Sequence, residues 1–128
     1  MEQAPVVSDE TVSGEDWSER DLGARSWRRT SFLDVDLTGA VAAGASFEEC
    51  TFRECDFGAV RFADAAFTAC TFSRSTFFDA TFVGCKLVGS GFDLCRFGAL
   101  TVEGGSWAFV RMPKADLRSA TFTGVALR

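Results

Sequence analysis

The sequence contains no histidine. Without histidine the chain lacks the commonest general base, the serine–histidine–aspartate triad and most kinds of zinc site. It also lacks the phosphate-binding patterns GxxxxGK[ST] and GxGxxG, and no Cys-x-x-Cys pair is present. These absences argue against an enzyme, and we expect no catalytic residues, no cofactor and no metal.

Long apolar runs are absent as well. No stretch approaches the roughly 18 residues of a membrane span, and the acidic N-terminus lacks the apolar segment of a signal peptide. We therefore expect a cytoplasmic protein without a membrane contact. The segment 1–15 contains several acidic side chains and no basic one, which predicts an acidic flexible tail. Residues 16–128 are then a single domain.

The chain is instead rich in phenylalanine with a period of five. Every fifth residue from Trp17 to Leu127 is apolar, and of the 14 phenylalanines and three tryptophans only Phe78 and Phe109 fall outside this register. Eight consecutive positions of the register are phenylalanine: Phe47, Phe52, Phe57, Phe62, Phe67, Phe72, Phe77 and Phe82.

A period of five fits neither a helix nor a straight strand. On an α-helix, residues five apart lie about 140° from one another, so their side chains spread around the axis. On a strand, side chains alternate between two faces, so an odd step moves every second phenylalanine to the opposite face. The same position can be buried each time only if the chain turns a corner within every repeat.

A second register supports this interpretation. The residue two positions before each apolar site is usually small, and the residue between them is usually polar. Residues at positions i−2 and i point the same way on an extended segment, while i−1 points outward. Glycine is frequent in the remaining two positions, which suits a turn. Each repeat is therefore predicted to be one short strand and one turn of a β-solenoid.

The repeat resembles the pentapeptide-repeat family, whose pattern is small–Asp/Asn–Leu/Phe–x–x. Matching stretches are Val35-Asp36-Leu37-Thr38-Gly39, Cys55-Asp56-Phe57-Gly58-Ala59 and Ala115-Asp116-Leu117-Arg118-Ser119. The resemblance implies that four pentapeptides close one coil. The expected fold is then an all-β, right-handed quadrilateral β-helix of about 5.5 coils.

The predicted core is a set of stacked phenylalanines. It consists of Phe32, Phe47, Phe52, Phe57, Phe62, Phe67, Phe72, Phe77, Phe82, Phe92 and Phe97. The five cysteines all fall on the small inward register: Cys50, Cys55, Cys70, Cys85 and Cys95. Because free cysteine is commonly buried as a small apolar residue, we interpret them as part of the core.

The charges are unevenly distributed along the chain. The formal net charge of −5 comes from the segment 1–16, while the segment 86–128 is net positive. The segment 30–85 carries an acidic belt that could contact a cationic partner, although random placement on a surface gives similar patterns. The belt consists of Asp34, Asp36, Glu48, Glu49, Glu54, Asp56, Asp64 and Asp79.

The resemblance suggests one partner class. Some fluoroquinolone-resistance members of the family resemble B-DNA and occupy the DNA site of type II topoisomerases, and this chain is similar to them only at the level of the repeat. A solenoid of about 27 Å corresponds to a duplex with roughly 16 negative charges, whereas the segment 17–128 is neutral overall.

We therefore expect a non-enzymatic scaffold that binds a protein of undefined identity. The alternative is a DNA-mimicking inhibitor of DNA gyrase or topoisomerase IV that protects against fluoroquinolones, which predicts the acidic belt on one continuous face. The acidic composition argues against direct binding of nucleic acid. A homodimer through the C-terminal end is left open.

Overall fold

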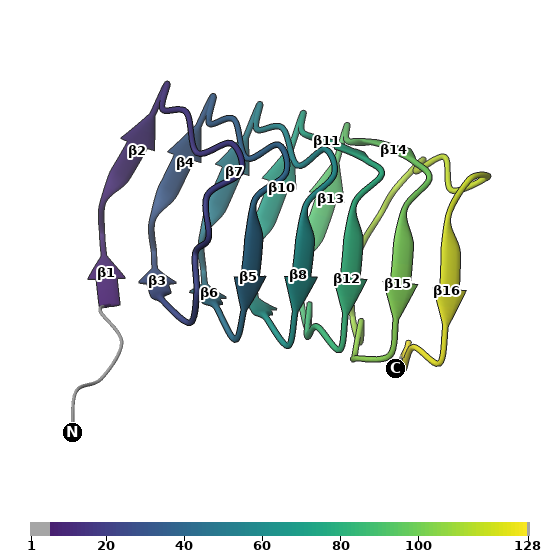
Figure 1. Ribbon diagram of the computed structural model, residues 1–128. Coiled ribbons are helices and arrows are strands. Elements are labelled where there is room, and N and C mark those ends of the chain that lie inside the picture. The colour runs from purple at the N-terminus through teal and green to yellow at the C-terminus, as the bar shows by residue number, and fades with distance from the viewer. Residues whose placement is uncertain (1–5, 128) are drawn as a thin grey trace.

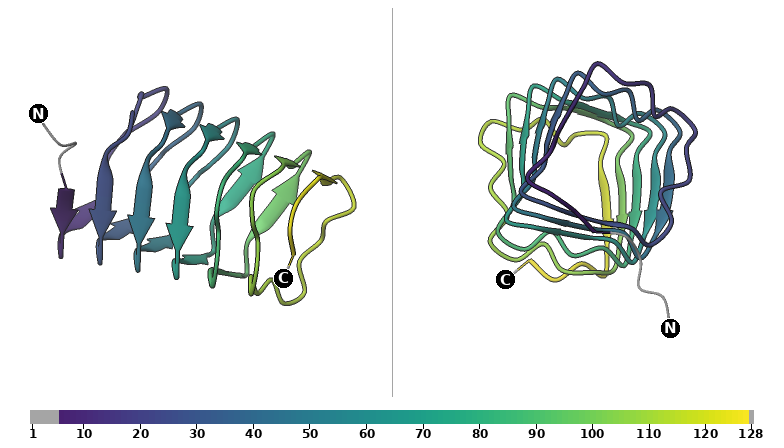
Figure 2. Two further views of the ribbon diagram at one scale, coloured as in Figure 1. Left: turned by 90° about the horizontal axis from the view of Figure 1, so that it is seen from below. Right: turned by 90° about the vertical axis from the view of Figure 1, so that its left-hand side faces the viewer.

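The computed structural model describes residues 6–127, and these residues form a β-solenoid of about six turns with no helix. Successive coils lie side by side along one axis, as Figure 1 shows. Seen along that axis, the section is four-sided (Figure 2). All strands of the described chain are short, and every pairing between them is parallel.

The strands form four faces, which we name A to D in chain order. Face A contains β1 (Val6–Ser8), β3 (Ser26–Arg28), β6 (Ser46–Glu48) and β9 (Ala66–Thr68). Face B contains β2 (Thr11–Ser13), β4 (Ser31–Leu33), β7 (Thr51–Arg53), β10 (Thr71–Ser73) and β13 (Gly91–Asp93). Face C contains β11 (Thr76–Phe78) and β14 (Arg96–Gly98). Face D contains β5 (Val41–Ala43), β8 (Arg61–Ala63), β12 (Thr81–Val83), β15 (Thr101–Glu103) and β16 (Thr121–Thr123).

The strand register confirms the predicted coil of four repeats. Phe47 pairs with Phe67, Phe52 pairs with Phe72, and the other faces keep the same offset. Isolated bridges between single residues extend the pattern where no strand forms, as between Asp36 and Asp56 on face C. Each residue therefore lies beside its counterpart four repeats later, about 4.8 Å away.

The inward phenylalanines form the expected core. All the predicted core residues are buried except Phe97, which is partly buried. Rings in the same column stack nearly parallel, with centroids 4.7 Å apart for Phe57 and Phe77 and 4.6 Å apart for Phe72 and Phe92. Face D is the exception, because Phe62 and Phe82 meet edge to face at 72°. In the preceding coil, the partner of Phe62 is the small Ala42. No aromatic ring on that side therefore holds Phe62 in a parallel stack.

Most turns place a residue in the left-handed region of backbone space. Many of these residues are not glycine, and Glu54, Arg74 and Leu94 are three of them, with φ of 54°, 50° and 55°. Such angles are uncommon for residues with a side chain. The repeated pairing between coils holds this conformation, so glycine is not required at every corner.

The small inward register also ties neighbouring coils together. The thiols of Cys55 and Cys70 donate to the carbonyl oxygens of Phe32 and Phe47, at 3.3 Å in each case. The hydroxyl of Ser90 accepts a hydrogen bond from the backbone N–H of Cys70 and donates to the carbonyl of Phe67. The cysteines are free, and all but Cys95 are fully buried, as their register predicts.

The prediction of a flexible tail is wrong for residues 6–15. Strands β1 and β2 belong to the solenoid, where Val7 pairs with Trp27 and Val12 pairs with Phe32. Both valines continue the apolar register, so the period of five extends further than the predicted boundary. Glu10 and Glu15 occupy the inward register here, and the open first coil leaves both carboxylates exposed. Residues 1–5 of the predicted tail lie outside the described residues.

The C-terminal coil is looser than the body. Within the described chain no strand forms on faces A, B and C beyond β14, and Leu117 is only half-buried. Phe97 is less buried than the other core phenylalanines because its counterpart in the next coil is this half-buried leucine. The C-terminal end of the described chain therefore exposes part of the core.

Candidate functional site

The structure divides the predicted acidic belt among all four edges of the solenoid. Asp34, Asp36, Glu54 and Asp56 lie together where face B turns into face C. Glu48 and Glu49 lie between faces A and B, Asp79 between faces C and D, and Asp64 between faces D and A. The belt thus does not form the single continuous face that a mimic of DNA requires.

Two of the belt carboxylates have a structural role. Asp36 Oδ1 accepts hydrogen bonds from the backbone N–H and the hydroxyl of Thr38, at 2.9 and 2.6 Å. Asp56 Oδ1 accepts the backbone N–H of Gly58 at 2.8 Å. Both aspartates occupy the Asp/Asn position of the repeat, and each satisfies a backbone donor in the turn that follows. Asp36 and Asp56 are therefore turn residues as well as surface charges.

The same bond lowers the pKa of other aspartates in this position. The hydroxyl and the backbone N–H of Ser18 donate to Asp16 and hold the pKa of its carboxyl below the ordinary value. The side chain and the backbone N–H of Arg118 lower the pKa of Asp116 to about 2. These carboxylates remain ionised across the physiological range.

The edge between faces B and C changes sign along the axis. Its corner column contains Asp34, Glu54, Arg74, Leu94 and Lys114, each one coil further along the axis. The neighbouring column on face C contains Asp16, Asp36, Asp56, Thr76, Arg96 and Asp116, and Asp116 forms an ion pair with Arg118 at 2.7 Å. We call the residues of these two columns the charged edge. It is acidic in the N-terminal half of the solenoid, and in the C-terminal half its charges are basic except for Asp116.

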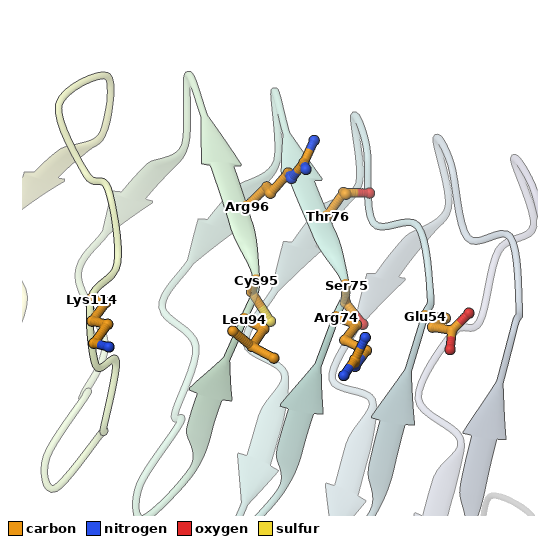
Figure 3. Close-up of a pocket in the computed structure, with 8 residues that line it drawn as sticks. All are labelled: Glu54, Arg74, Ser75, Thr76, Leu94, Cys95, Arg96 and Lys114. Carbon is orange, nitrogen blue, oxygen red and sulfur yellow. The ribbon is translucent and has the colours of Figure 1, made fainter.

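The basic half and Glu54 of the acidic half together line a shallow hollow of about 740 Å³. Figure 3 shows Glu54, Arg74, Leu94 and Lys114 in one row across successive coils, with Arg96 and Thr76 displaced toward face C. Within residues 6–127, Arg74, Arg96 and Lys114 take part in no ion pair. Leu94 lies among them with 63% of its surface exposed.

The acidic residues between faces A and B differ from this group because basic residues face them within the same chain. Arg28 lies 3.9 Å from Glu48 in the next coil. Arg29 binds Asp9 at 2.8 Å, and this hydrogen bond raises the pKa of the arginine. Glu48 and Asp9 already have partners, so this edge is a weaker candidate for binding another molecule.

A second hollow lies at the C-terminal end and is apolar. Its volume is about 420 Å³, and its lining includes Trp107, Met112, Phe122 and Leu127. The indole Nε1 of Trp107 is buried without a hydrogen-bond partner in the described part of the chain. The homodimer considered from the sequence would use this end, and it stays a prediction.

The described residues offer little for catalysis or metal binding. Residues 6–127 contain no group of three or more histidine, cysteine, aspartate or glutamate side chains that could hold a metal. Burial raises the pKa of Cys55, Cys85 and Cys95 to about 11, so these thiols are neutral at physiological pH and poor nucleophiles. Among the described residues no helix is long and apolar enough to cross a membrane.

Sequence reasoning found the acidic residues of the charged edge but missed the basic ones. Arg74, Arg96 and Lys114 are far apart in the sequence, and no local motif connects them. The signal that could have found them is the offset of four repeats, since positions 34, 54, 74, 94 and 114 share one column.

Comparisons with known proteins gave one family and several solved structures. The family described as "SV2A/B/C luminal domain" matches residues 24–97. No match was found among curated proteins.

The similar solved structures are pentapeptide-repeat proteins of low sequence identity. QnrB1, described as a plasmid-mediated fluoroquinolone resistance protein, is 15% identical, with 97% of this chain and 72% of that chain covered and a TM-score of 0.49. A pentapeptide repeat protein from the Arabidopsis thaliana thylakoid lumen is 18% identical, with 72% and 64% covered and a TM-score of 0.49. Rfr23 from the cyanobacterium Cyanothece 51142 is 10% identical, with 96% and 84% covered and a TM-score of 0.33.

Proposed function

Since the chain belongs to the SV2A/B/C luminal domain family and folds as a pentapeptide-repeat solenoid, we propose that it is a non-enzymatic scaffold that binds another protein along its charged edge. The solenoid supplies a rigid ladder of coils with a constant spacing. Side chains in the corner columns are then presented at regular intervals on a firm surface. Recognition by such a surface depends on the order of charges and apolar groups along it.

One observation carries the proposal: the hollow with three unpaired basic residues around an exposed leucine. Within residues 6–127, Arg74, Arg96 and Lys114 lie on neighbouring coils without an ion pair. Arginine is enriched in protein interfaces, where it pairs with carboxylates in a fixed geometry. Leu94 adds an apolar contact at the centre. An acidic segment of a protein is the partner that this combination fits best.

An acidic peptide tests this proposal without knowledge of the partner. A fluorescent octaglutamate peptide should bind at low salt, and binding should weaken at least about tenfold in the double variant R74E/K114E. Arg61→Glu is the control, because Arg61 is an exposed arginine on face D. Equal binding by all three proteins would contradict the proposal.

The alternative is that the protein mimics DNA and inhibits DNA gyrase or topoisomerase IV, with protection against fluoroquinolones. It rests on the resemblance of the repeat alone. The division of the acidic belt among four edges gives it no support. A gyrase supercoiling titration tests it, and the scaffold proposal predicts no inhibition. Inhibition that disappears in the variant D34N/E54Q would favour the alternative.

The cytoplasm remains the proposed compartment. Its support is the set of five free cysteines, because reducing compartments keep thiols unpaired. Fractionation of cells that express the tagged chain tests it, and recovery in a membrane-enclosed lumen would contradict it.

A further inference from the structure

We infer that the partner of the charged edge is a second copy of this chain, bound side by side and antiparallel. This inference rests on the proposed function of the charged edge and names its partner. The geometry behind it is the order of charges along the edge. The sign changes between the coil of Glu54 and Asp56 and the coil of Arg74 and Thr76, near the middle of the solenoid.

An antiparallel pair places opposite charges against each other. The proposed two-fold axis is perpendicular to the solenoid axis and passes between the coil of Glu54 and the coil of Arg74. It brings each column of one copy against the same column of the other copy. Glu54 of one copy then lies opposite Arg74 of the second copy, and Asp36 lies opposite Arg96. Asp16 lies opposite Asp116, whose charge is offset by Arg118 of its own copy. Because the interface is two-fold symmetric, each of these pairs occurs twice.

The constant coil spacing keeps the register along the whole edge. Both copies repeat about every 4.8 Å, and therefore one aligned pair aligns the others. Asp34 of one copy comes next to Leu94 and Arg96 of the second copy, inside the hollow. Leu33, half-buried at the end of β4, borders this contact on face B, where the two-fold axis sets it opposite Asp93.

A parallel arrangement of two copies lacks this complementarity. A parallel pair would set Asp34 and Asp36 against the same residues of the other copy, and the basic half against the basic half. Like charges in contact oppose association. The contact strip is one edge wide and mostly exposed charge, so we expect a weak dimer that forms at high protein concentration and dissociates in salt.

Reciprocal charge reversal tests the inference. Asp34 and Arg96 are three coils apart within one chain, about 15 Å, so they cannot compensate each other inside a single copy. Asp34→Lys and Arg96→Asp should each weaken the dimer at least about tenfold in low-salt sedimentation equilibrium. The double variant D34K/R96D restores the contact between positions 34 and 96 at both symmetric sites, while Asp36 still faces the new carboxylate, so it should dimerise at least about threefold more tightly than either single variant.

Asp79→Lys is the matched control, because Asp79 is an exposed turn residue with a positive φ on another edge. It should dimerise as the wild type does. Near-identical circular dichroism spectra of all variants would show that the fold is kept.

Three results would overturn the inference. The first is that the wild-type protein is a monomer at every protein and salt concentration. The second is that Asp34→Lys and Arg96→Asp both dimerise as the wild type does. A dimer lost only on Phe122→Asp would show instead that copies meet through the apolar C-terminal hollow. If the monomeric protein still binds the octaglutamate peptide, the second copy is excluded while the proposed function stands. If the protein binds neither a second copy nor the octaglutamate peptide, the inference and the proposed function both fail.

Discussion

The buried phenylalanines carry most of the stability at the level of single residues. Phe67 has no exposed surface and contacts rings in its own column and in the neighbouring ones. Phe67→Ala should lower the free energy of unfolding by about 3–5 kcal/mol in urea titrations.

Phe109 is the matched control for this prediction. It lies outside the apolar register, and 77% of its surface is exposed. Phe109→Ala should change the free energy of unfolding by less than about 0.5 kcal/mol. Similar losses for the two variants would show that the inward register does not define the core.

The inward cysteines predict a loss of stability at alkaline pH. Burial raises the pKa of Cys55 and Cys85 to about 11, from an ordinary value of 9.0. Above pH 9 the unfolded chain loses thiol protons that the folded chain keeps, so ionisation favours unfolding. The stabilisation is complete below about pH 9 and is lost as the pH rises toward 11.

This prediction can be measured in urea because the chain contains no tyrosine to ionise in the same range. The unfolding midpoint should fall between about pH 9 and about pH 11, and it should fall less in the variant C55A/C85A. Equal slopes for the variant and the wild type would assign the loss to other groups.

At the scale of the turn, one glycine is required for space. Gly105 has a φ of 79°, and a Cβ there would overlap the carbonyl oxygen of Cys85. Gly105→Ala should therefore lower the free energy of unfolding by about 2 kcal/mol or more. Gly104 also has a positive φ, but nothing approaches its Cβ position closer than 3.9 Å. Gly104→Ala should cost only about 1 kcal/mol, and a reversed order would contradict the turn geometry.

The aspartates of the repeat should separate into turn residues and free charges. Asp56→Ala removes the acceptor for the N–H of Gly58 and should cost about 1 kcal/mol in thermal unfolding. Asp56→Asn keeps a side-chain oxygen in place and should recover most of the loss. No side-chain hydrogen bond holds Asp34 within the described residues, so Asp34→Ala should be close to neutral. Equal effects at both positions would remove the structural role of Asp56.

The elements were largely predictable from the sequence because the repeat is local. The apolar register identified the inward residue of each strand, and the pairing of Phe47 with Phe67 confirmed the coil of four repeats. The first coil was missed because Glu10 and Glu15 stand where the pattern expects small residues. An open end tolerates charge in the inward register because water reaches it, and local pattern cannot distinguish that case from a flexible tail.

The candidate site was less predictable, because it depends on residues that meet only in space. Asp34 and Glu54 stood out as acidic residues, but their relation to Arg74 and Lys114 depends on the coil length. The sequence also could not separate Asp36, bound in a turn, from Asp34, which has no such bond among the described residues. The two aspartates differ in the hydrogen bond that Asp36 accepts from Thr38, and only the structure shows it.

At the scale of the whole molecule, the solenoid is a rod whose four edges differ in charge. The edge between faces A and B has internal ion pairs, whereas Arg74, Arg96 and Lys114 on the charged edge have none within residues 6–127. One edge of the rod is thus available for an external contact, and its reversal of sign suits a copy of itself in the opposite direction.

The most direct test of this account is nuclear magnetic resonance of the 13.9 kDa chain over a dilution series at low salt. The account predicts that backbone amide shifts change with concentration along the charged edge, at residues such as Asp34, Glu54, Arg74 and Arg96, and that salt abolishes the changes. Shifts confined to the hollow around Trp107 and Phe122, or no shifts at all, would contradict the central claim that the charged edge is the contact surface.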